Sequence, residues 1–502
     1  NMGAYLTGKI AEGVAADFAA MYRESEDFVK DLNYGGKVGG YHVGSLRGKL
    51  MVEPSDSAKL VLISEYFERR GSENVYQPYN GNTAGKAFPG AIVPTGPWEQ
   101  STDLVPVLNI RRYNFALQTT FNFDGFDLQT TSSYANNRTE QATDSDSSNI
   151  MLATFVAPAI KSKVYSQEVR LLSASNGPFQ WIAGAYAFYL DGSADFILSN
   201  RTNPSSPLAV RRFNSDINTT SFAGFGEGTY EVVPQVFLTG GVRYTHEKRE
   251  FDQVINGVHL FPEQVDKSFD KTTFRVSLRY NFSDKANVYA TYSTGFKSGV
   301  FNMTGTSAAP TEPETLDAIE GGIKADPFSW LRTNLAVYYY DYKNLQVTAR
   351  DPTGPGYVLQ NAATAEVYGG ELEVTVAPHR DFTVRGSVAY THGTYDKFPA
   401  AQVFIPLPTG GNIVTQADVS GNNMARAPRW SFNVSPNWTH DFGVGTLGVN
   451  ASLYYSDRVY FDFMNSTSQP AYALLNGEIS WTTADEKLRV SLWAANLTNK
   501  TV

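Results

Sequence analysis

The chain has no cysteine among its 502 residues, which excludes structural disulfides and thiolate metal ligands. It also lacks any apolar run near the ~18 residues that a membrane-spanning helix needs; the stretch 181–190 is among the longest. There is no basic excess, since the net charge is −9, whereas a nucleic-acid partner favours a basic chain. These absences argue against a disulfide scaffold, a helical membrane protein and a nucleic-acid-binding protein.

Catalytic and metal-binding patterns are missing as well. The sequence contains no G-x-S-x-G elbow and no candidate Ser/His pair, so it predicts no enzyme. The six histidines are scattered, which argues against a metal site, and we expect no cofactor. Asp144 and Asp146 lie in a long connection without the glycine and distal glutamate of a calcium loop, so we expect a solvated acidic loop there.

What is present along the whole chain is a two-residue alternation of apolar and polar side chains. In the segment 236–245, Val242 and Tyr244 share one face of a strand and Arg243 lies on the other. The same alternation recurs at 274–280, 335–339 and 488–492. It fits a soluble sandwich, whose apolar face is the core, or an outer-membrane barrel, whose apolar face meets lipid.

The connections between these segments alternate between short and long. Tight turns such as 124–125 and 283–284 contain Gly, Ser or Asp, which suit such turns, whereas polar connections such as 70–108 and 394–427 are much longer. Strict alternation places all short turns at one end of a barrel and all long loops at the other. The sequence therefore predicts an all-β fold, a transmembrane antiparallel β-barrel.

About twenty strand-like segments can be counted, the first at 5–10 and the last at 486–499. If both termini of a closed barrel lie in the periplasm, one further strand is expected before Asn1 and one after Val502, which gives about 22. The chain is also rich in Phe (31) and Tyr (29). Their positions near strand ends favour aromatic girdles at the membrane interfaces over a general preference of these residues for sheets.

Several segments resemble the signatures of the TonB-dependent outer-membrane receptor family. The run 288–302 (VYATYSTGFKSGVFN) is similar to a strand and loop of that family, and 313–324 resembles the segment that follows it. Further similar segments are 237–248, 361–374 and 495–500. The matches follow the family order over about the C-terminal half, whereas the N-terminal half fits more loosely.

The resemblance implies a barrel of 22 strands in the outer membrane of a Gram-negative bacterium, closed by an N-terminal plug and coupled to TonB through a TonB box. We expect residues 1–502 to be the barrel domain, incomplete at both ends and without the plug. The implied function is active uptake of a scarce ligand, most often a ferric siderophore or another metal chelate, with cobalamin, an oligosaccharide or an aromatic compound as alternatives. The implied partners are outer-membrane lipid, TonB through the absent N-terminal segment, and the small-molecule ligand, on a monomeric barrel.

Other functions remain open at this stage. A passive diffusion channel would typically have fewer strands and a loop folded inward as a constriction. A structural barrel would anchor companion proteins of the envelope. An outer-membrane enzyme would need a Ser/His constellation near one rim.

Candidate site residues fall into two sets. Ligands of such receptors are usually captured by the outer loops, where aromatic residues and arginine supply contact area and charge. The candidates for ligand binding are Tyr76, Tyr79, Trp98, Arg211, Arg212, Tyr357, Tyr460 and Phe461. The strand alternation predicts a second set that faces the lumen, where charge pairs hold a plug or water: Arg243, Arg275, Arg279, Glu371 and Glu373.

Overall fold

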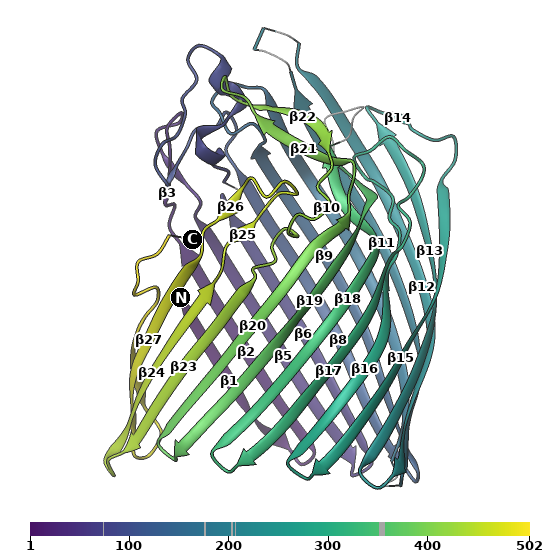
Figure 1. The fold of residues 1–502 in the computed structure, drawn as a ribbon. Coiled ribbons are helices and arrows are strands. Elements are labelled where there is room, and N and C mark those ends of the chain that lie inside the picture. Colours follow the sequence, from purple (N-terminus) through teal and green to yellow (C-terminus); the bar gives the residue numbers. More distant parts are fainter. Residues whose placement is uncertain (74, 175–176, 202–203, 206, 351–356, 502) are drawn as a thin grey trace.

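The computed structural model describes residues 1–73, 75–174, 177–201, 204–205, 207–350 and 357–501. One antiparallel sheet of 21 strands curls into a barrel (Figure 1). Its first ten strands are β1 (Met2–Ala11), β2 (Val14–Ser25), β5 (Tyr41–Ser55), β6 (Ala58–Gly71), β8 (Val107–Phe123), β9 (Phe126–Asp144), β10 (Ala153–Ser173), β11 (Phe179–Asn200), β12 (Ala209–Val233) and β13 (Val236–Ile255).

The remaining strands of this sheet are β14 (Val258–His259), β15 (Val265–Ser283), β16 (Ala286–Lys297), β17 (Glu314–Phe328), β18 (Leu331–Arg350), β19 (Tyr357–His379), β20 (Phe382–Lys397), β23 (Trp430–Asp441), β24 (Gly445–Ser456), β27 (Tyr472–Thr483) and β28 (Arg489–Ala494). Because β14 has only two residues, the prediction of about twenty spanning strands in an antiparallel β-barrel is confirmed. Each long strand pairs with the next long strand along the chain, so the topology is a simple meander.

All short turns lie at one end of the barrel, here called the turn end, and the long connections lie at the opposite loop end (Figure 1). The turn between β1 and β2 uses Gly13 and the turn between β8 and β9 uses Gly125, both at positive φ. Positive φ suits glycine because it has no Cβ to clash with the backbone. The alternation of short and long connections is therefore present as the sequence predicts.

The outer face of the barrel is apolar and is bordered by two aromatic belts. Near the loop end, outward rings contact one another from strand to strand: Tyr66 with Tyr113, Phe115 with Tyr134, Tyr134 with Tyr165, and Tyr165 with Tyr189. At the turn end, Phe123 contacts Phe126, Phe328 stacks on Trp330, and Phe442 contacts Trp481. Aliphatic side chains such as Val242 and Leu278 lie exposed between the belts. An apolar band between two aromatic belts is the outer surface of a β-barrel that spans a lipid bilayer.

The loop end carries smaller elements: β3 (Val29–Asp31), β4 (Lys37–Val38), β7 (Glu99–Gln100), β21 (Ala401–Pro406), β22 (Asn412–Ala417), β25 (Val459–Tyr460), β26 (Ser468–Gln469) and the short helices η1 (Tyr79–Gly81) and η2 (Ala84–Ala87). Within the described part of the chain, no helix is both long and apolar enough to cross a membrane.

One hairpin reaches across the mouth of the barrel at the loop end. It consists of β21 and β22, and an apolar cluster that includes Phe398 and Val403 holds its base. Its tip meets the connection between β6 and β8, where Asn82 Nδ2 donates to Asn412 Oδ1 over 3.0 Å. Since β6 and β20 are not neighbours in the sheet, this contact joins two separate parts of the rim (Figure 1).

Candidate ligand-binding site

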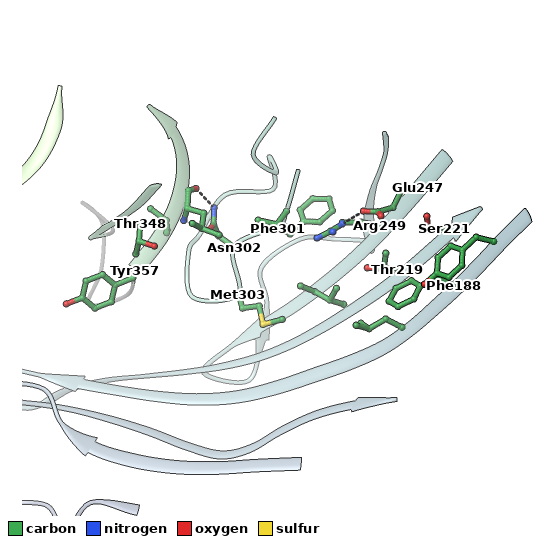
Figure 2. A pocket seen from close by; sticks show the side chains of 16 residues that line it. Phe188, Thr219, Ser221, Glu247, Arg249, Phe301, Asn302, Met303, Thr348 and Tyr357 are labelled. Atoms are coloured by element: carbon green, nitrogen blue, oxygen red, sulfur yellow. Dashed lines mark hydrogen bonds and ion pairs between the residues drawn. The ribbon is translucent and has the colours of Figure 1, made fainter. Parts of the chain in front are cut away.

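A cavity of about 720 Å³ lies on the inner wall of the barrel towards the loop end (Figure 2). Three neighbouring strands, β11, β12 and β13, form its wall. The two-residue alternation of β12 decides which of its side chains line the cavity. Thr219 and Ser221 are buried and face the lumen, whereas Phe222 faces outward and is exposed. The volume lies within the usual range for small-molecule sites, which is roughly 300–1,000 Å³.

The wall of the cavity is mainly apolar and contains one ion pair. Tyr186, Phe188 and Leu190 of β11 lie beside Ile217 of β12. On β13, Arg249 Nε donates to Glu247 Oε1 over 2.7 Å, and both side chains are largely buried. Figure 2 shows this pair at the edge of the cavity, next to Phe301.

The roof of the cavity is the segment 300–303, which belongs to the connection 298–313 between β16 and β17 and folds inward. Phe301 is almost fully buried and stacks on Phe251 of β13, with ring centroids 5.2 Å apart. The carbonyl oxygen of Met303 accepts hydrogen bonds from Gln253 Nε2 (2.6 Å) and Ser215 Oγ (3.0 Å). These contacts attach the roof to the strands that form the wall.

A second set of contacts attaches the roof, and the rest of the connection 298–313, to the opposite side of the cavity. Asn302 Nδ2 donates to the Leu359 carbonyl oxygen (3.0 Å), and the Leu359 N–H donates to Asn302 Oδ1 (2.6 Å). Gln346 Nε2 of β18 donates to the carbonyl oxygen of Ser298 (3.0 Å) and to that of Glu312 (3.1 Å). The roof therefore bridges β12 and β13 to β18 and β19.

The two glutamines that hold the roof are only partly satisfied. Gln253 and Gln346 are buried, and each donates through its Nε2. Their Oε1 atoms are also buried, and neither has a hydrogen-bond partner among the described residues. A buried carbonyl oxygen without a donor destabilises the arrangement that buries it, by about 1–3 kcal/mol.

The structure places the eight ligand-binding candidates in separate parts of the loop end. Tyr357 lines the cavity, at the end opposite Phe188 (Figure 2). Trp98 packs edge-on against Phe28, and Arg212 Nε donates to Asp195 on the outward face of β11 and β12. The other five candidates are outside the lining: Tyr76 and Tyr79 lie between β6 and β8, Arg211 is in β12, and Tyr460 and Phe461 lie at or next to β25.

The predicted lumen-facing charges make contacts between strands. Arg243 lies over the rings of Tyr186 and Phe225, at 5.5 and 5.4 Å from their centroids. Arg275 Nη2 donates to Glu227 Oε1 over 3.0 Å. Because Tyr186 also lines the cavity, Arg243 supports one part of its wall.

The other three predicted charges lie further along the lumen. Arg279 stacks over Phe237, 4.6 Å from its centroid. Asn334 Nδ2 donates a hydrogen bond to Glu373. Glu373 lines a second, more polar cavity of about 270 Å³ together with Arg332 and Arg385. Glu371 is exposed on the same face of β19 as Glu373.

Sequence reasoning missed most of the cavity lining. Phe188, Glu247 and Arg249 lie on long strands that continue beyond the aromatic belt near the loop end. The ligand-binding candidates predicted from the sequence were instead residues of the outer loops. A signal did exist for the roof, because Val300, Phe301 and Asn302 are the last residues of the segment 288–302 that resembles the family signature.

The expectation of a solvated acidic loop at Asp144 and Asp146 is wrong. Asp144 is buried and accepts hydrogen bonds from the backbone N–H groups of Asp146 (2.9 Å) and Ser147 (3.0 Å). Burial, followed by the charge of Asp146, raises the pKa of Asp144 to about 8, and burial raises the pKa of nearby Asp103 to about 6. Among the described residues no cluster of His, Cys, Asp or Glu could hold a metal ion.

Comparison with known proteins finds receptors among the relatives of this chain. The pesticin receptor of Yersinia enterocolitica is 23% identical over 342 residues, which cover 66% of this chain and 47% of the receptor. The probable TonB-dependent siderophore receptor PiuA of Acinetobacter baumannii is 22% identical over 302 residues, covering 58% of this chain and 38% of PiuA. The chain thus spans less than half the length of these curated relatives.

Solved structures show the same fold. The ferric yersiniabactin uptake receptor FyuA of Yersinia pestis superposes with a TM-score of 0.82 at 17% identity, covering 99% of this chain and 72% of that one. The siderophore receptor PiuA of Acinetobacter baumannii gives 0.75 at 16% identity, with 99% and 75% coverage. The family described as TonB-dependent receptor-like β-barrel matches residues 57–497. The chain therefore belongs to the TonB-dependent receptor β-barrel family.

Proposed function

We propose that this barrel is the membrane-spanning part of a receptor for TonB-dependent active uptake of a scarce small ligand, with a ferric siderophore as the leading candidate. As a member of this family the chain is a protein of the bacterial outer membrane. The observation that carries the proposal is the roofed cavity on the inner wall, which has the size of a small-molecule site and lies between the mouth and the deeper lumen. The names of the relatives, which include siderophore receptors, support this choice of ligand.

In the proposed mechanism, the outer loops and the cavity capture the ligand, and an N-terminal plug, driven through TonB, opens the path inward. Residues 1–502 act as the barrel domain, a rigid frame in which no bond is made or broken. The lumen-facing residues Arg243, Arg275 and Arg279, with Glu371 and Glu373, are proposed to hold the plug or water. Their cross-strand contacts support a structural role over direct ligand contact.

The number of strands argues against the main alternative. A passive diffusion channel would typically have fewer strands than the about twenty long strands of this sheet. Of the remaining alternatives, a structural barrel predicts stable companion proteins, and an enzyme predicts a single substitution that abolishes turnover.

The test uses the full-length protein in a strain deleted for its own copy and grown under iron limitation. Uptake of radioactive iron supplied as chelates is measured with and without functional TonB, and the purified protein is examined in planar bilayers. Uptake that requires both the receptor and TonB supports the proposal. Steady ion conductance of the whole protein, or uptake that continues without TonB, would contradict it, and co-purification of stoichiometric partners without uptake would point to the structural role.

A further inference from the structure

The described lining of the cavity that carries the proposed function has no net charge. Its only charged lining residues among those described are Glu247 and Arg249, which bind each other over 2.7 Å with 15% and 21% of their side chains exposed. The neighbouring charges on β13, Lys248 and Glu250, occupy the opposite face of the strand and pair with each other over 2.8 Å. Among the described lining residues, no unpaired cation is therefore available to neutralise an anion.

This neutrality limits which ligands the cavity accepts. Transfer of a charged group from water into a largely apolar site is costly unless opposite charges and hydrogen bonds compensate. Sites for polyanionic ligands therefore gather several arginines or lysines, because a guanidinium binds carboxylates and phenolates with two parallel hydrogen bonds. Here Arg249 already donates to Glu247, and freeing it would leave a buried carboxylate unpaired.

The uncharged part of the lining favours flat and apolar groups. Phe188 and Tyr186 present aromatic rings from the wall, and the roof contributes the ring of Phe301 and the thioether of Met303. Aromatic pairs are stabilised beyond the burial of their area, and the flexible thioether of methionine adapts to irregular shapes. The hydroxyls of Thr219 and Ser221 can donate to or accept from a neutral polar group.

We infer that the cavity selects an electroneutral metal chelate with an aromatic rim and discriminates against polyanionic chelates. This inference rests on the proposed function, because it specifies the class of ligand that the receptor takes up. The Glu247–Arg249 pair is assigned as the selectivity element: it supplies polar contacts without net charge. Phe188 is assigned as the wall residue that contacts the aromatic rim of the chelate.

The test measures binding of three inert chromium(III) complexes to the purified full-length receptor. Chromium(III) exchanges its ligands slowly, so the complexes stay intact during titration. Tris(benzohydroxamato)chromium is neutral and aromatic, tris(acetohydroxamato)chromium is neutral without rings, and tris(catecholato)chromate is aromatic but carries three negative charges. We expect the neutral aromatic complex to bind at least about tenfold more tightly than the trianion, since a like-charge or uncompensated contact costs more than ~1.4 kcal/mol.

Two variants separate cavity charge from overall charge. Glu247→Gln leaves Arg249 unpaired in the cavity and should improve binding of the trianion by roughly tenfold, with little change for the neutral complexes. Glu250→Gln changes the net charge of the protein equally, but on the outward face, and should leave all three affinities unchanged. Phe188→Leu should reduce the preference for the benzohydroxamate over the acetohydroxamate complex by about two- to tenfold.

The outcomes distinguish this inference from the proposed function. Equal or tighter binding of the trianion by the unmodified receptor, no binding of any complex to folded receptor, or identical effects of Glu247→Gln and Glu250→Gln would each overturn the inference. TonB-independent uptake would instead refute the proposed function and leave the order of affinities intact. Variants are compared only after their heat-resistant migration on gels shows a folded barrel.

Discussion

Asn302 binds the backbone of Leu359 through both ends of its side-chain amide, donating to the carbonyl oxygen over 3.0 Å and accepting from the N–H over 2.6 Å. A side chain here replaces the two hydrogen bonds that a neighbouring strand would make. The interaction links the roof of the cavity to the first residues of β19, which lie far from it in sequence (Figure 2).

Replacing Asn302 should therefore detach the roof on this side. Asn302→Ala loses both hydrogen bonds and should destabilise the closed position of the segment 298–303 by about 1–3 kcal/mol. Asn302→Asp keeps an acceptor for the N–H of Leu359 but places a carboxylate against the carbonyl oxygen of Leu359. It should therefore destabilise the closed position of the segment nearly as much as Asn302→Ala does. Faster hydrogen exchange in this segment, with the exchange of β1 and β2 unchanged, is the expected result; unchanged exchange in both variants would show that the amide does not hold the roof.

The hairpin tip offers a second prediction, because a Cβ built at Gly411 would lie 3.6 Å from Cβ of Ala84. That separation suits a disulfide, and the chain has no other cysteine to interfere; a cysteine at Gly411 has to adopt a positive φ of 75°, which costs some stability but leaves the two Cβ atoms in reach. The double variant Ala84→Cys/Gly411→Cys should form an intramolecular disulfide under mild oxidation, seen as a shift in gel mobility that a reductant reverses. Closing the mouth in this way should slow ligand uptake until the reductant is added.

A matched control is Gly90→Cys combined with Ala84→Cys, because nothing lies within 4 Å of a Cβ at Gly90. This pair should stay reduced under the same conditions. Equal cross-linking of both pairs would mean that the loops sample many positions and that the hairpin does not rest on η2.

The buried carboxylates at the loop end predict a dependence on pH. The pKa values of Asp144, about 8, and Asp103, about 6, lie above the ~3.9 of an unfolded aspartate, so the folded loop holds protons that the unfolded loop has released. Local stability should therefore be highest below about pH 4 and should fall as the pH rises towards 8. Hydrogen exchange around residues 144–153, corrected for its intrinsic pH dependence, should reveal more frequent opening at pH 8 than at pH 5.

Asp144→Asn tests the cause of this pH effect. The amide oxygen can still accept from the backbone N–H groups of Asp146 and Ser147, but the side chain no longer ionises. The loss of stability between pH 5 and 8 should shrink. Asp418→Asn, at an exposed carboxylate whose pKa is lowered by its hydrogen bonds with Ser420, should leave it unchanged; a pH effect of equal size in all three proteins would place its origin elsewhere.

The two faces of β15 predict opposite tolerance to charge. Leu278 is 51% exposed on the outer face between the aromatic belts, whereas the adjacent Ser277 faces inward and its hydroxyl lies 2.7 Å from that of Thr291. Leu278→Lys should lower the free energy of unfolding in lipid vesicles by about 2–4 kcal/mol, because the ammonium group meets hydrocarbon. Ser277→Lys should cost less than half as much in the same denaturant titration, and the reverse order would contradict the assignment of the two faces.

The features that the sequence could predict are those that depend on neighbouring residues in the chain. Whether a side chain such as Leu278 or Ser277 points out or in follows from the two-residue period of a strand, and the ends of the strands follow from turn residues such as Gly125. Strand number, antiparallel pairing and the membrane-facing surface could therefore be predicted without coordinates.

The cavity depends instead on contacts between residues far apart in sequence. Nothing near Asn302 in the chain indicates that it will bind Leu359, and Glu247 and Arg249 gain their importance only because the roof folds onto their strand. Asp144 shows the same limit, since an acidic stretch in a long connection normally indicates exposure and here tertiary packing buries it. Of the loop candidates, Tyr357 alone lies in the cavity lining among the described residues.

Gln253 and Gln346 give the roof an unusual energetic character. Each donates hydrogen bonds to carbonyl oxygens of the connection between β16 and β17. The Oε1 atom of each glutamine is buried and accepts no hydrogen bond from the described residues. The closed position is therefore held by several bonds and at the same time penalised by about 1–3 kcal/mol for each orphaned oxygen. Opening of this segment would break several hydrogen bonds and at the same time return both oxygen atoms to water, so it should cost less than the number of hydrogen bonds alone suggests.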